Sequence, residues 1–147
     1  MESQLSGIAV LVDAAQDRRM THHIPYRLKR IDELESIHHG SVKLAGDDLG
    51  IESFGLQVLD FPPDFAAYPE HDHAADGQEE VYVILDGSAE FEVAGERVPA
   101  EAGAMLRVGP ESRRTLVAGP HGVRILAVGC SPGGYERPDA FRVTGQA

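Results

Sequence analysis

The chain has 147 residues, a length that suits a single domain built around one hydrophobic core. Its formal net charge is −11, from 24 acidic against 13 basic residues, which argues against binding to nucleic acids or to anionic membranes. Cys130 is the one cysteine, so no intrachain disulfide can form and a reducing cytoplasm is the expected location.

Residues 1–40 are predicted to form an N-terminal arm with peripheral segments. The apolar run at residues 8–12 is too short to span a bilayer and lacks a basic leader, so no signal peptide is expected. A short helical turn is expected at residues 30–35. Two adjacent histidine pairs, at residues 22–23 and 38–39, are expected to be exposed, because neighbours in an extended chain point to opposite faces and cannot readily hold one ion.

Short apolar runs separated by turn-forming residues predict strands from residue 54 onward. The dipeptide Asp86-Gly87 predicts a tight hairpin, Ala94-Gly95 a further turn, and residues 119–122 (Gly-Pro-His-Gly) another turn. The strands expected between these turns cover residues 54–61, 80–85, 89–93, 104–108, 114–118 and 123–128.

No helix-length pattern interrupts these strands, which predicts an all-β fold. Closure of the strands into an antiparallel β-barrel or jelly roll would hide the edges of the sheet. The barrel is expected over residues 41–131, followed by a C-terminal tail at residues 132–147 without periodicity.

The residues with the most distinctive chemistry are His71, His73 and Glu80. The two histidines are two positions apart, so in an extended chain both rings project from one face. Glu80 shares a strand face with Tyr82, whereas Glu79 lies on the opposite face. Two imidazoles and one carboxylate that converge from one side match the facial triad that holds a divalent metal and leaves coordination positions open.

This segment resembles the first motif of the cupin superfamily, a His-x-His pair followed by a Glu, six residues and a Gly. Because six residues separate Glu80 from Gly87, the glutamate role is assigned to Glu80. Six residues also lie between His73 and Glu80, where the family has three or four, so an enlarged turn is expected. The resemblance implies the double-stranded β-helix of a small single-domain cupin, no organic cofactor, and a divalent transition metal (iron, manganese, nickel, copper or zinc).

The second cupin motif is matched by Gly103 and Pro110, but Arg114 stands where the family has its fourth ligand, a histidine. Arginine stays protonated and has no lone pair for a metal. Three interpretations remain open: a metal held by three protein ligands and water, an Arg114 that binds a ligand carboxylate or phosphate without metal, and a hydrogen-bonded network with no ligand. Tyr82 and Met105 are expected to line the cavity as further substrate-binding residues.

The resemblance extends to isomerases, dioxygenases, lyases and non-catalytic binding proteins, so the fold alone does not choose an activity. One hypothesis is a metal-dependent enzyme that acts on a small, anionic organic molecule. The alternative is a metal-free cupin that binds a small molecule or regulates a partner. The resemblance also implies a homodimer, for which the apolar face of Val81, Val83 and Leu85 is the candidate surface.

Overall fold

The computed structural model describes residues 25–141. The interpretations of the apolar run at residues 8–12 and of the histidine pair at residues 22–23 therefore lie outside the described residues. Within residues 25–141, none of the helices has the length and hydropathy needed to cross a membrane.

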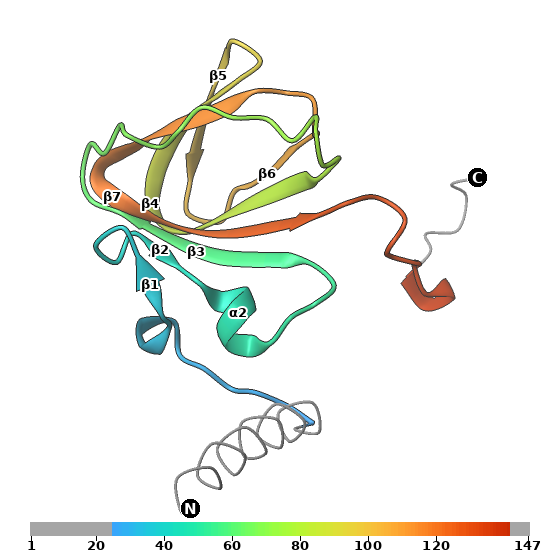
Figure 1. The fold of residues 1–147 in the computed structure, drawn as a ribbon. Helices are drawn as coiled ribbons and strands as arrows, with labels where there is room; N and C mark the ends of the chain where they lie inside the picture. Colours follow the sequence, from blue (N-terminus) through green and yellow to red (C-terminus); the bar gives the residue numbers. More distant parts are fainter. Residues whose placement is uncertain (1–24, 142–147) are drawn as a thin grey trace, which may run out of the picture.

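Seven strands form one strongly curved antiparallel sheet (Figure 1). Its strand order is β1-β2-β3-β7-β4-β5, and β6 pairs with β4 beside β5. The all-β prediction is confirmed. The elements are η1 (Ile31–Glu33), β1 (Ser36–Ile37), β2 (Val42–Lys43), α2 (Ala45–Leu49), β3 (Gly55–Phe61), β4 (Glu79–Val93), β5 (Glu96–Glu101), β6 (Met105–Val108), β7 (Arg114–Cys130) and η2 (Asp139–Phe141).

The two longest strands, β4 and β7, correct two of the predicted turns. Asp86-Gly87 does not close a hairpin but lies inside β4, and residues 119–122 lie inside β7. At this level β4 has one residue, Ser88, between the pairs Gly87–Val123 and Ala89–Ala118, while β7 has four. The irregularity bends both strands, so that each runs through two parts of the sheet.

Glycines are needed at this bend because two backbones approach closely there. Gly87 and Gly122 both have positive φ, +70° and +79°. A Cβ on Gly87 would lie 2.1 Å from the carbonyl oxygen of Gly122. Turn-forming residues therefore mark a corner in a continuous strand here. The same residues favour a tight turn locally, which is why the prediction of a hairpin at Asp86-Gly87 is wrong.

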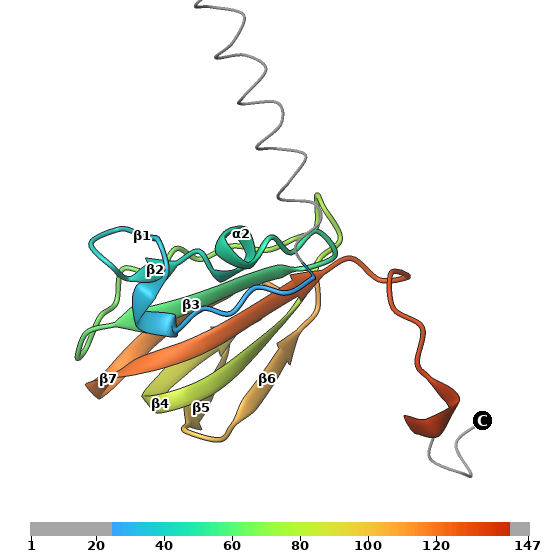
Figure 2. The ribbon, with the colours of Figure 1, turned by 90° about the horizontal axis from the view of Figure 1, so that it is seen from below.

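The N-terminal elements cover the outer side of β3 (Figure 2). Leu34, Ala45 and Val58 are buried together in a small second core between β3 and these elements. The helical turn expected at residues 30–35 is present as η1, whereas β1, β2, α2 and β5 were not predicted from the sequence. His38 and His39 are exposed in the turn between β1 and β2, both with positive φ.

The main core fills the inside of the curved sheet. Its fully buried side chains include Tyr82, Phe91, Leu116 and Ile125, which come from β4 and β7. The register of β4 against β7 places these residues on the same concave side. The site described below lies at the end of this core, where β4 begins.

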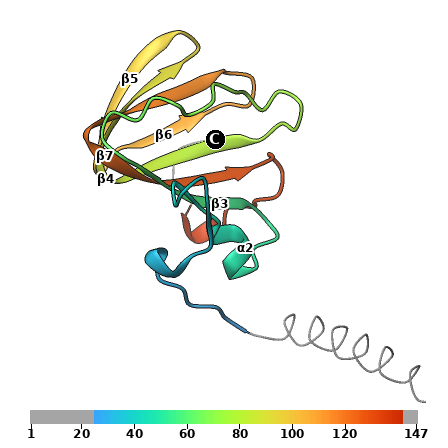
Figure 3. The same ribbon diagram turned by 60° about the vertical axis from the view of Figure 1, so that its left-hand side comes forward.

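The connection between β3 and β4 crosses the open side of the sheet and runs antiparallel to the first half of β7 (Figure 3). Backbone bonds join Asp64 to Gly119 and Phe65 to Ala118, and the Thr115 hydroxyl donates to the carbonyl of Tyr68. Further along, His71 and Arg114 form an antiparallel bridge. The connection therefore behaves as an additional, irregular strand, and this position carries its histidines to the end of the core.

Candidate metal centre

Glu80 enters the site from the concave face of β4. Its neighbours across the sheet are Val108 of β6 and Gly129 of β7. A Cβ on Gly129 would lie 3.5 Å from the Glu80 Cγ and 3.0 Å from the Gln78 side-chain oxygen, so this glycine leaves room for the glutamate. Glu79 lies on the outer face and forms an ion pair with Arg107 at 2.7 Å. The structure thus places Glu80, not Glu79, beside the two histidines.

His71 and His73 are held by backbone bonds on both sides of the pair. The amide of His71 donates to the carbonyl of Arg114 at 3.0 Å, and the amide of His73 donates to the carbonyl of Pro110 at 2.8 Å. The carbonyl of His73 accepts bonds from Asp76 and Gly77, which closes the enlarged turn before β4. The long spacing between His73 and Glu80 is therefore absorbed in a hydrogen-bonded turn, and the side chains still meet.

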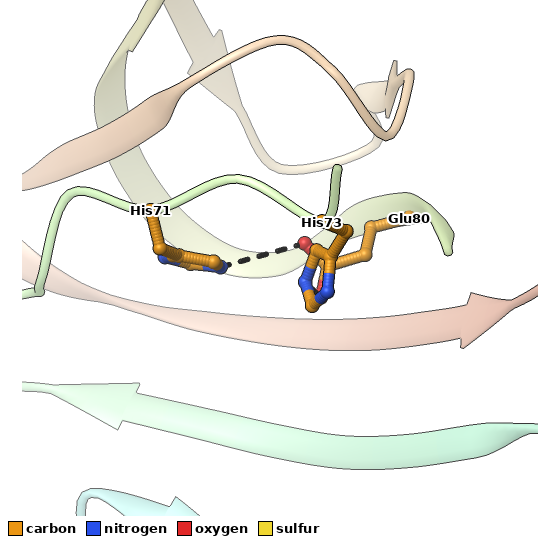
Figure 4. Close-up of side chains that lie close together, drawn as sticks. All are labelled: His71, His73 and Glu80. Atoms are coloured by element: carbon orange, nitrogen blue, oxygen red, sulfur yellow. Dashed lines mark ion pairs between the residues drawn. The ribbon is translucent and has the colours of Figure 1, made fainter. Parts of the chain in front are cut away.

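The three side chains converge in space (Figure 4). One candidate ligand atom from each of them lies within 4.8 Å of the other two. Nε2 of His71 is 3.8 Å from one carboxylate oxygen of Glu80, and Nε2 of His73 is 3.3 Å from the other. Ligands bound to one transition metal at about 2.1 Å stand roughly 3 to 3.5 Å apart, so this spacing is close to that of a coordinated set.

Hydrogen bonds at the far side of each ring determine which nitrogen faces the glutamate with a lone pair. Nδ1 of His71 lies 2.9 Å from the carbonyl oxygen of Pro69, and Nδ1 of His73 lies 3.1 Å from the carboxylate of Asp76. Both partners only accept, so in a neutral ring Nδ1 carries the proton and Nε2 carries the lone pair. This is the arrangement in which outer partners orient histidine ligands for a metal.

The donor set also leaves a buried atom that a cation would satisfy. Nε2 of His73 is buried and forms no hydrogen bond, although the Glu80 carboxylate is only 3.3 Å away. A nitrogen lone pair and a carboxylate oxygen repel each other unless a proton or a metal ion lies between them. The residues present therefore fit a divalent metal, with two nitrogen ligands and one oxygen ligand.

Arg114 is fully buried, and its contacts are all with the protein. Its Nη2 donates to the carbonyls of Gly109 at 3.1 Å and Val108 at 3.4 Å. Its Nε lies 3.5 Å from the Glu80 carboxylate, outside hydrogen-bond geometry, and Nη1 has no partner among the described residues. With an exposed fraction of 0%, the guanidinium touches no solvent-accessible space that a ligand could enter.

Two tyrosines extend the site toward the core. The buried Tyr82 donates a hydrogen bond from its hydroxyl to Glu80, and the Tyr68 ring packs edge-on against His71. Burial raises the pKa of the Tyr82 hydroxyl above its ordinary value, and the neighbouring Tyr68 and the bond to Glu80 raise it further. Burial raises the pKa of Tyr68 as well. Both hydroxyls are therefore neutral, and Tyr82 acts as a donor to the glutamate.

Met105 does not line the interior, which corrects its expected role. It pairs with Val83 on the outer face and is 71% exposed, whereas Leu106 pairs with Tyr82 on the concave face. The sequence distance between Glu80 and Met105 does not determine which face of the sheet Met105 occupies. The register of β6 against β4 determines whether Met105 or Leu106 faces inward.

A groove of about 750 Å³ lies elsewhere, beyond the Gly87 corner on the half of β4 that does not carry Glu80. Three alanines paired across the strands, Ala100, Ala89 and Ala118, line it together with Glu90 and other residues. It is separate from the triad, and we assign it no role.

No protein-family model and no curated protein matches the sequence. Solved structures do match it. A cupin protein from Bacteroides fragilis superposes with a TM-score of 0.66 at 20% identity, over 84% of this chain and 99% of that one. The chain has the cupin fold. The recognition made from the two motifs is confirmed at the level of the fold.

Two further structures show the same cupin fold at similar distance. One is a sugar phosphate isomerase of the cupin superfamily from Silicibacter pomeroyi, with a TM-score of 0.58, 17% identity, and coverage of 71% of this chain and 75% of that one. The other is a predicted oxalate decarboxylase from Thermotoga maritima, with a TM-score of 0.56, 22% identity, and coverage of 71% and 99%. At these identities the likeness concerns the fold.

Two further residues of this candidate site lie outside the predicted set. Asp76, in the enlarged turn, orients His73, and Tyr68 packs on His71 and lies beside Tyr82. Asp76 had a local signal, because an Asp three residues after a histidine in a turn can reach back to it. Tyr68 had none, since its contact with Tyr82 spans two different segments.

Proposed function

We propose that this cupin binds a divalent transition metal through His71, His73 and Glu80 and acts on a small, anionic organic molecule at the open positions of the ion. The observation that carries the proposal is the pair of Nε2 atoms aimed at one carboxylate, each ring oriented by a fixed acceptor on its far side. Three protein ligands leave room for water or substrate on the ion.

The charge of such a centre favours an anionic ligand. The charge of a divalent ion exceeds the single negative charge of Glu80. The buried guanidinium of Arg114 adds a further positive charge, with its Nε 3.5 Å from the Glu80 carboxylate. The names of two structural neighbours, a sugar phosphate isomerase and a predicted oxalate decarboxylase, also refer to anions, which is support by fold analogy only. A bound metal would polarise a coordinated oxygen of the substrate and assist isomerase, lyase or dioxygenase chemistry.

The protein's own residues have separate tasks in this proposal. Asp76 and the Pro69 carbonyl hold the two rings in the orientation that presents Nε2. Tyr82 donates to Glu80 and keeps one carboxylate oxygen in place. Arg114 does not meet the substrate directly in this structure, because its side chain is fully buried.

A specific observation favours the second candidate, a metal-free binding cupin. Arg114 already places a cation beside Glu80, so the glutamate has a counter-charge without any metal. In that case the small molecule would bind in the barrel mouth through hydrogen bonds alone.

Elemental analysis of protein purified without added ions tests the proposal. We expect about one equivalent of iron, manganese, nickel, copper or zinc per chain, and we expect it to be lost in His73→Ala. The control is His121→Ala, which should retain the metal, because His121 is exposed and far from the triad in the sequence. Protein that is free of metal and also fails to bind any of these ions in calorimetric titration would favour the metal-free candidate.

Addition of small carboxylates and sugar phosphates then tests the ligand class. A thermal shift that appears with the metal and disappears after chelation supports the metal-dependent function. A shift that is unchanged by chelation supports the binding module.

A further inference from the structure

The position of Arg114 relative to His71 is set by the backbone. The two residues exchange both backbone hydrogen bonds, at 3.0 and 2.8 Å, in an antiparallel bridge. Residues opposed in this way carry their side chains on the same face and next to each other. Residue 114 therefore projects from β7 toward the space that the triad encloses.

The guanidinium is held there at one nitrogen by backbone carbonyls. Two carbonyls, those of Val108 and Gly109, hold its Nη2. Its Nε approaches the same Glu80 oxygen that accepts from Tyr82 and lies 3.8 Å from His71 Nε2. A side chain with no exposed surface cannot serve as a docking group for substrate without first leaving this position.

The charge of Arg114 has opposite effects on the stability of the centre with and without a metal ion. When no ion is bound, Arg114 compensates the buried charge of Glu80, which would otherwise face two nitrogen lone pairs. When an ion binds to Glu80, the ion and the guanidinium lie within a few ångströms of each other and repel. The arginine therefore stabilises the empty centre and destabilises the filled one.

We infer that Arg114 is a built-in counter-cation, a positioning residue that holds Glu80 in register with the two histidines and makes metal binding weaker than it would be with a neutral residue at this position. The inference rests on the proposed metal site. It also replaces the expectation that Arg114 contacts substrate.

Substitution of Arg114 provides the test, because the inference predicts a gain that a purely structural role cannot give. Arg114→His supplies a fourth nitrogen ligand on the same face, and Arg114→Gln removes the charge while keeping amide donors for the Val108 and Gly109 carbonyls. We expect calorimetric titration with Zn²⁺ and Mn²⁺ to show binding roughly 10-fold tighter in Arg114→Gln, because the repulsion by the guanidinium is removed, and a larger gain in Arg114→His, to which the added ligand contributes. The matched control is Arg113→His, because Arg113 is exposed and paired with Glu70; its affinity should equal that of the wild type.

The outcomes separate the inference from the proposed function. If the wild type binds metal and Arg114→Gln does not bind it more tightly, the inference is wrong and the metal site stands. If the wild type binds no metal but Arg114→Gln does, and the added change His73→Ala abolishes that binding, the inference holds and the proposed metal-dependent function fails.

Circular dichroism and thermal unfolding with a chelator present show whether the variants fold. A variant that folds only after metal is added supports the inference, since the ion then replaces the lost charge. Variants that stay unfolded with and without metal overturn it, because the guanidinium would then be required for structure whatever its charge does.

Discussion

Asp76 is the residue on which the orientation of His73 depends. Its carboxylate lies 3.1 Å from Nδ1 of His73 and also accepts bonds from the backbone and side chain of Gln78. The bond from the Gln78 backbone, and after it the His73 side chain, hold the pKa of Asp76 below its ordinary value. The aspartate is thus a fixed, ionised acceptor that keeps the His73 lone pair turned toward Glu80.

Replacement of Asp76 by Ala should therefore weaken metal binding without removing a ligand. We expect a loss of about 10- to 100-fold in affinity, the range found for partners that orient metal-bound histidines. Calorimetric titration checks the value, and Glu111→Gln, at an exposed position outside the triad, is the control that should bind like the wild type. An unchanged affinity in Asp76→Ala would show that His73 needs no outer partner.

The buried hydroxyls of Tyr68 and Tyr82 predict how stability depends on alkaline pH. Both have a pKa raised above the ordinary value of 10.0. In the unfolded chain they ionise near that ordinary value, while in the folded chain they stay protonated, so stability is full below pH 10 and falls as the pH rises above it.

The check is urea unfolding at several pH values from 8 to about 11, with a chelator present. Tyr68→Phe should lower the slope of this alkaline loss, whereas Tyr26→Phe, at a tyrosine that is 77% exposed, should leave it unchanged. Equal slopes for the wild type and both variants would contradict the argument.

At the scale of elements, the corner shared by β4 and β7 is the most constrained feature of the fold. Gly87 combines a positive φ with a backbone neighbour that leaves no room for a Cβ. Beyond the corner, β4 pairs with β5, and before it with β6. The corner therefore sets where the sheet bends and where the half of β4 that carries Glu80 ends.

Gly87→Ala separates the clash from the backbone preference. We expect a loss of about 3 kcal/mol or more in the free energy of unfolding, because both the left-handed φ and the contact with Gly122 become unfavourable. Gly95→Ala is the matched control: φ is +83° and no atom lies within 4 Å of the added carbon, so only about 1 to 2 kcal/mol should be lost. Equal losses in denaturant unfolding would mean that the strands relax around the added methyl group.

On the scale of the whole molecule, one outer face of the sheet is apolar and only partly covered. The N-terminal elements cover β3, where Val58 is 1% exposed, but Leu85 of β4 is 42% and Met105 of β6 is 71% exposed. Val83, which pairs with Met105, and Val81, which pairs with Arg107, are half-buried on the same side of β4. A face of this kind marks an interaction surface more often than a free one.

We therefore expect a homodimer that uses this face, as the family resemblance implies. Light scattering after size-exclusion chromatography should give twice the chain mass for the wild type and a shift toward the monomer for Met105→Glu. Val117→Glu is the control. Val117 is 44% exposed, much like Leu85, but it lies on the half of β7 before the corner, away from the proposed dimer face. A monomeric wild type would leave the face to some other occupant.

The sequence by itself determined the all-β class and the three residues that meet at the candidate centre. Both results rest on local patterns: alternation reports which strand residues share a face, and His-x-His spacing in extended chain puts both rings on one side. The choice of Glu80 over Glu79 follows from the resemblance to the cupin motif, through the spacing to Gly87. The end of β3 and the turn at Ala94-Gly95 were readable for the same reason, because prolines and turn residues act over a few positions.

The tertiary structure alone decided the rest, since it depends on which segments pair. Asp86-Gly87 and residues 119–122 look like turns until the crossing strands make them a corner, and Met105 faces outward because of its register with Val83. Arg114 looked like a ligand-binding cation. Its contacts with the carbonyls of Val108 and Gly109, and its bridge to His71 from a distant segment, bury the guanidinium 3.5 Å from the Glu80 carboxylate. No local pattern encodes such contacts, because strand pairing and burial are properties of the folded chain as a whole.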